Sequence, residues 1–147
     1  MLQELSRNPG TYILVVEMRE AREVAVGRLG RWVFPAGWYL YVGSALGGLA
    51  GRVGRHLRRE KRLHWHIDYL LAHGTVQEVW YRVGAERREC ALAQRLAALP
   101  GAERYPPRFG ASDCRCPGHL VRFVGRPPLE ALGFGGFRHL SRSLWAN

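Results

Sequence analysis

The first third of the chain is a series of short apolar runs, each closed by glycine or proline. Residues 11–18 are rich in β-branched and aromatic side chains, which is typical of a buried strand. Residues 23–28 and 31–34 flank a Leu29-Gly30 interruption that favours a hairpin, and Pro35 to Gly37 turn the chain into another apolar run at 38–42. The pattern predicts a small antiparallel sheet over residues 11–43.

Helical periodicity begins after this sheet. Apolar residues one turn apart predict helices over 49–61, 64–72 and about 87–99, and alternation predicts strands over 76–83 and 119–124. With 147 residues and 47% hydrophobic composition, the chain supports one core. We therefore expect one α+β domain over 1–147, a mainly antiparallel central sheet flanked by helices, with its core at about 9–125 and a tail, 126–147, packed on that core.

The chain is strongly basic, and almost all of its positive charge is arginine. The formal net charge is +10, and Lys61 is the only lysine. Arginines gather between 52 and 62 and between 82 and 95, which favours a polyanionic partner because guanidinium binds phosphate bidentately and stacks on bases. A GC-rich genome, which enriches arginine codons, is the alternative. Three cysteines and no long apolar run favour a cytoplasmic protein that does not enter a membrane.

Two tyrosine motifs precede an arginine and a histidine at helical spacing. Gly10-Thr11-Tyr12 opens the first predicted strand, Tyr41-Val42-Gly43-Ser44 closes the last strand of the sheet, and Arg52 and His56 follow one turn apart. Phosphodiester hydrolysis needs a hydroxyl that positions or deprotonates water and a fixed cation beside the phosphorane. Together with residues 64–71 and 109–114, this order resembles the GIY-YIG nuclease domain, in particular its Uri superfamily endonucleases, over about residues 9–125.

The resemblance implies a metal-dependent endonuclease that cleaves DNA. It places Tyr41 as the tyrosine that activates water, Tyr12 as the tyrosine that completes the phosphate and water network, and Arg52 as the transition-state cation. Some members carry a lysine where this chain has Ser44, so His56 or an arginine would have to lower the tyrosine pKa from its usual value of ~10 and assist proton transfer. The alternative is that both tyrosines are core residues bonded to carbonyls.

Glu89 matches the single metal-binding carboxylate of the family. A hard cation keeps most of its waters and needs only one or two protein carboxylates, so the resemblance implies Mg²⁺ or Mn²⁺ at Glu89. An ion pair with a neighbouring arginine is the alternative. Ser112 and Asp113 are further polar candidates in the loop that follows Phe109.

The expected partner is DNA, with a structured or branched form favoured because no separate targeting domain is evident; delivery by a partner protein is the other route. Besides the catalytic set, the residues expected to contact nucleic acid are Ser44, Arg55, Arg59, Lys61, His64 and His66. His64 and Asp68 share a helix face at i, i+4, where the pair could bind a metal or a phosphate, or the aspartate could cap the helix or orient the imidazole.

Two rival functions remain open from the sequence. One is a catalytically silent nucleic-acid-binding module that uses the same arginines. The other is a zinc-stabilised interaction domain, in which Cys114, Cys116 and His119 are joined by Cys90.

Overall fold

The computed structural model describes residues 5–112, 114–131 and 136–146. Its centre is the pair of strands β1 (Gly10–Met18) and β4 (Gly37–Ala45), which run antiparallel with Tyr12 opposite Gly43 and Leu14 opposite Tyr41. Both strands are buried along most of their length, as their continuous apolar sequences require. The two tyrosine motifs therefore lie side by side at one end of the central strand pair.

The remaining strands extend this pair in both directions. The six-stranded sheet has the order β6-β7-β4-β1-β5-β8, and every neighbouring pair is antiparallel. Its outer strands are β5 (Thr75–Val83), β6 (Glu103–Arg104), β7 (Leu120–Phe123) and β8 (Arg138–Ser141). The predicted hairpin, β2 (Arg22–Ala25) and β3 (Arg31–Phe34), forms a separate two-stranded sheet and does not extend the central one.

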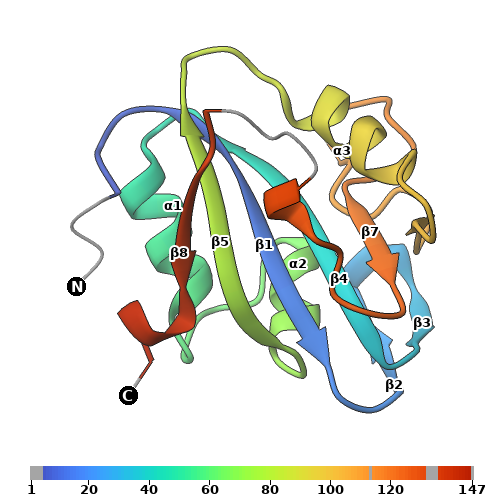
Figure 1. Ribbon diagram of the computed structural model, residues 1–147. Helices are drawn as coiled ribbons and strands as arrows, with labels where there is room; N and C mark the ends of the chain where they lie inside the picture. Colours follow the sequence, from blue (N-terminus) through green and yellow to red (C-terminus); the bar gives the residue numbers. More distant parts are fainter. Residues whose placement is uncertain (1–4, 113, 132–135, 147) are drawn as a thin grey trace.

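Helices cover both faces of the sheet (Figure 1). The core on one face lies under α1 (Leu49–Leu57) and α2 (His66–Leu71), where it includes Tyr12 and Tyr41. The core on the other face lies under α3 (Glu89–Ala97), which buries Leu92 and Leu96. Three short 3₁₀ turns, η1 (Gly27–Leu29), η2 (Leu129–Ala131) and η3 (Arg142–Leu144), complete the elements. The α+β prediction is confirmed.

Helix α1 ends four residues before its predicted end. Arg58 is already extended, with φ −71° and ψ 136°. The ammonium of Lys61 donates to the backbone carbonyls of Arg55 at 3.3 Å and of His56 at 2.5 Å. These are carbonyls of the last turn, and that of Arg55 also accepts from the backbone N–H of Arg58 at 3.3 Å. The only lysine of the chain therefore caps α1.

The tail contributes a strand that sequence patterns did not reveal. In Figure 1, β8 (dark red) lies beside β5, and the register pairs Leu140 with Val79. Leu129 and Leu140 are buried, and the partly buried side chain of Trp145 packs against the core. In the described ranges, no helix is long and apolar enough to span a bilayer.

Candidate functional site

One pocket gathers the residues that the motifs singled out. It has a volume of about 160 Å³ and lies where β1, β4, α1 and the start of α3 meet. All five predicted catalytic residues line it together with one predicted nucleic-acid contact: Tyr12, Tyr41, Arg52, His56, Glu89 and Ser44. The fold thus brings together side chains from four elements that are up to 77 positions apart in sequence, from Tyr12 to Glu89.

A hydrogen bond between a tyrosine and a histidine joins the first tyrosine motif to helix α1. The Tyr12 hydroxyl lies 2.7 Å from Nε2 of His56, and both side chains are almost completely buried. Gly43, directly opposite Tyr12, makes room for this contact, since a Cβ there would overlap the Tyr12 hydroxyl. The glycine of the second motif is therefore required by the tyrosine of the first.

Burial sets the protonation of this pair. It raises the pKa of Tyr12 and of Tyr41 above the usual tyrosine value, although the positive charge of Arg52 acts in the opposite direction. Burial, with a further contribution from Lys61, lowers the pKa of His56 to about 3. Both tyrosines are thus phenols and His56 is a neutral imidazole at neutral pH, so the expected lowering of the tyrosine pKa does not occur in the free protein.

Trp65 holds the cationic wall of the pocket. The guanidinium carbon of Arg52 lies 4.5 Å from the centre of the Trp65 ring, and that of Arg55 lies 4.3 Å from it. Arg52 also donates from Nη1 to the backbone carbonyl of Ser44 at 3.2 Å. Cation–π contact and this hydrogen bond orient Arg52 at the pocket.

The Asp68 carboxylate is bonded within the fold, to Arg55 and to the start of α2. Its buried carboxylate accepts two hydrogen bonds from Arg55, both 2.9 Å, and one from each of the backbone N–H groups of His64 and Trp65. Burial by itself would raise the pKa of Asp68, but these hydrogen bonds hold it below its usual value. Of the alternatives for His64 and Asp68, the structure shows that Asp68 caps the start of α2. Asp68 also forms an ion pair with Arg55.

The other predicted nucleic-acid contacts lie outside the lining of this pocket. Arg59 and Lys61 line a second, larger cavity of about 610 Å³, and His56 borders both cavities. His64 is exposed beside Trp65, their ring centres 5.5 Å apart. His66 accepts a hydrogen bond at Nδ1 from the backbone N–H of Gly110 at 2.8 Å, so this imidazole supports a loop.

That loop closes one side of the pocket. Gly110 has φ +75°, a conformation that favours glycine, and a Cβ there would lie 2.9 Å from the Tyr41 ring. Ser112 is exposed, and Asp113 lies outside the described residues. Sequence reasoning missed Trp65, Arg87 and Gly110 as pocket residues. An aromatic residue between two histidines was the available signal for Trp65.

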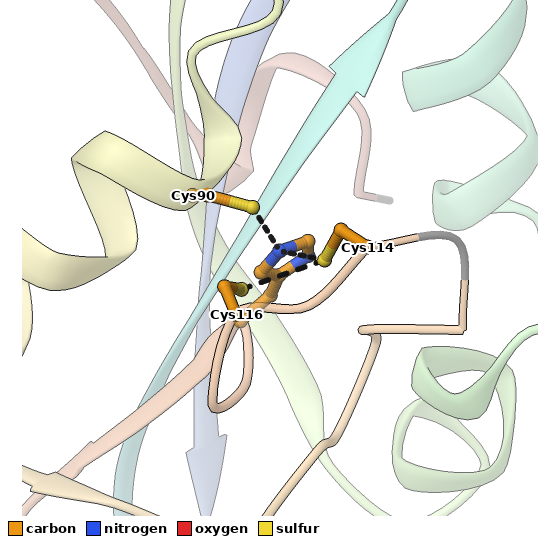
Figure 2. A group of neighbouring side chains, drawn as sticks. Cys90, Cys114 and Cys116 are labelled. Atoms are coloured by element: carbon orange, nitrogen blue, oxygen red, sulfur yellow. Dashed lines mark hydrogen bonds between the residues drawn. The ribbon is translucent and has the colours of Figure 1, made fainter.

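Glu89 lies on the opposite wall, at the first residue of α3, and its Oε2 accepts a hydrogen bond from the Ser44 hydroxyl. The next residue, Cys90, belongs to a cluster with Cys114, Cys116 and His119, whose donor atoms all lie within 4.8 Å of one another. Figure 2 shows Cys90 reaching from α3 toward Cys114 and Cys116 on a loop.

The prediction of Mg²⁺ or Mn²⁺ at Glu89 is wrong on this finding. Among the described residues, the group able to surround a metal consists of three sulfurs and one imidazole nitrogen. Thiolate and imidazole are donors that zinc prefers, whereas Mg²⁺ and Mn²⁺ prefer oxygen. Cys90 is a member of this cluster and not an ordinary buried helix residue.

Comparison with known proteins gives one family. The family described as "Domain of unknown function DUF123" matches residues 11–140. No curated protein and no solved structure matches the chain. The matched segment contains both tyrosine motifs except Gly10, the residues that line the pocket and all four members of the cysteine–histidine cluster. Because the match covers most of its length, the chain belongs to the DUF123 family.

Proposed function

We propose that this protein is an endonuclease that hydrolyses phosphodiester bonds of DNA at the tyrosine pocket. One observation carries the proposal: Tyr12 and His56, which share a buried hydrogen bond, line the same pocket as Arg52. Its supports are the net charge of +10 and the resemblance of the motifs to GIY-YIG nucleases of the Uri branch.

The Tyr12–His56 pair supplies the proton step. Water at the pocket gives a proton to the Tyr12 oxygen while the Tyr12 proton passes to Nε2 of His56, which requires the tautomer protonated at Nδ1. The resulting hydroxide forms a bond to phosphorus, the bond from phosphorus to the leaving oxygen breaks, and that oxygen takes a proton from solvent. His56 then releases its extra proton to solvent, which restores the neutral pair. The negative charge of a bound phosphodiester favours the imidazolium that forms, which offsets part of the burial effect on His56.

Arg52 stabilises the negative charge of the transition state. Its guanidinium is held between the Ser44 carbonyl and the Trp65 ring, so it is oriented before substrate arrives. A fixed cation beside the phosphorane stabilises negative charge that develops in the transition state. Ser44 and Glu89, bonded to each other, form the facing wall and position the water.

A panel of labelled DNA and RNA tests the proposal. The panel contains duplex, nicked, flapped, branched and single-stranded forms, assayed with and without added divalent salt, and Arg52→Ala is the control for contaminating nucleases. The expected result is cleavage of at least one DNA form by the parent protein, with product amounts that fall in the Arg52→Ala preparation. Cleavage that is equal in both preparations, or absent from every substrate, would overturn the proposal.

A catalytically silent nucleic-acid-binding domain with a zinc-stabilised frame is the second candidate. The observation that favours it is the cysteine–histidine cluster, because closed zinc sites commonly stabilise small binding domains. Binding without cleavage across the panel would favour this function. In both cases binding should weaken with salt, with a log–log slope of about −0.9 for each phosphate neutralised.

A further inference from the structure

Three cysteines and one histidine meet beside the pocket from two distant segments. Cys90 comes from the first turn of α3, whereas Cys114 and Cys116 come from a loop (Figure 2). His119 is the last residue before β7. The His119 Nε2 atom lies 3.3 Å from the sulfur of Cys90 and 3.4 Å from that of Cys114, and the sulfurs of Cys114 and Cys116 are 3.5 Å apart. All three cysteines are free thiols.

These three separations are close to the edges of a tetrahedron around zinc, and the remaining donor pairs of the cluster lie within 4.8 Å of each other. With Zn–S bonds of ~2.3 Å and Zn–N bonds of ~2.0–2.1 Å, tetrahedral geometry places two sulfurs about 3.8 Å apart and a sulfur about 3.6 Å from a nitrogen. The observed separations of 3.3–3.5 Å are within a few tenths of an ångström of these values. We propose that Cys90, Cys114, Cys116 and His119 bind one Zn²⁺ ion in a closed, four-coordinate site.

A closed site of this kind is structural. Four protein donors fill the tetrahedral shell, so the zinc has no open position for water or substrate. The ion instead joins the start of α3 to the loop, two segments that are 24 positions apart from Cys90 to Cys114. Because the unfolded chain rarely holds these four donors together, the free energy of zinc binding stabilises the folded state.

The zinc site also shares a wall with the tyrosine pocket, because Cys114 and His119 line both. The backbone N–H of His119 donates to the Phe109 carbonyl at 2.7 Å, and its carbonyl accepts from Val42, next to Tyr41, at 3.0 Å. Zinc bound to Cys90 would fix the adjacent Glu89 against Ser44. This positioning role rests on the proposed function, whereas zinc binding does not.

Metal analysis of the purified full-length chain tests the binding. After expression in zinc-supplemented medium and dialysis, the protein should hold about one zinc per chain, and Cys116→Ser and His119→Asn should hold roughly tenfold less. His64→Asn, which changes an exposed histidine outside the cluster, is the matched control and should keep its zinc. Replacement by Co²⁺ should give the intense near-ultraviolet thiolate absorption of a tetrahedral cobalt site.

A second measurement uses only the parent protein, in case a variant does not fold. Stripping zinc with a chelator should expose all three cysteines to alkylation. The Tm of the stripped protein should be about 8–16 °C below that of the protein in free zinc at about a thousand times the Kd. A parent protein without zinc or a cobalt spectrum, or with a Cys114–Cys116 disulfide, would overturn the inference. DNA cleavage by a zinc-free protein would remove only the positioning role. Zinc binding without cleavage would remove the proposed function and the positioning role that rests on it, and would leave the zinc site in place.

Discussion

Changing Tyr12 to Phe removes one oxygen from the centre of the pocket and leaves the ring in place. The hydroxyl is bonded to His56 Nε2 at 2.7 Å in a site that water does not reach freely. Leaving the imidazole without this partner costs about 1–3 kcal/mol, which lowers the Tm of a chain of this length by roughly 2–12 °C. If the pair carries the proton, cleavage by the folded variant should fall about 10²–10⁴-fold.

Tyr39→Phe is the matched control. Tyr39 is equally buried on the same face of the sheet, and its hydroxyl donates to the Pro35 carbonyl at 2.6 Å, outside the pocket. This variant should lose a similar amount of stability and keep its cleavage rate. Thermal unfolding gives the loss of stability, and single-turnover cleavage measured below the lower Tm gives the loss of activity in the folded protein. A Tyr12→Phe protein that is folded and cleaves as fast as Tyr39→Phe would refute the proton step.

Three further substitutions test two residues of the pocket and the Arg55–Asp68 ion pair near it. Arg52→Ala should slow single-turnover cleavage about a hundredfold or more, whereas Arg58→Ala, on the exposed side, should mainly weaken DNA binding in a salt titration; equal small losses would make Arg52 a surface arginine. Asp68→Asn should cost about 3–5 kcal/mol in urea unfolding because the partly buried Arg55 loses the carboxylate that neutralises its charge. Since the pKa of Asp68 is lowered in the folded state, its contribution is present above about pH 4 and is lost as the pH falls through the folded pKa, so the parent should lose stability there more steeply than the variant. Glu89→Gln should bind DNA as tightly as the parent or more tightly in a fluorescence titration, because one negative charge leaves a phosphate pocket; weaker binding would show that the Glu89 charge helps to hold the substrate.

Local patterns were sufficient for most of the elements. Period-two and period-3.6 repeats depend only on neighbours in sequence, so β1, β5 and the start of α1 could be placed from them. The end of α1 could not, because Lys61 caps it through a side chain that folds back onto the last turn. Strand β8 was missed because four residues next to an irregular tail carry too little periodicity, and pairing with β5 defines the strand.

For the candidate site too, some features could be predicted from the sequence and others depend on the tertiary structure. The sequence alone determined which residues to suspect at the pocket, since two tyrosine motifs followed by Arg52 and His56 form an ordered pattern along the chain. Only the tertiary structure decided the protonation and the partners of these residues. Burial keeps Tyr12 protonated and His56 neutral, and Arg55 forms an ion pair with Asp68. It also decided that Cys90 joins the other three members of its cluster. Such contacts join residues far apart in sequence, and their strength depends on burial and distance, which exist only once the sheet and helices have packed.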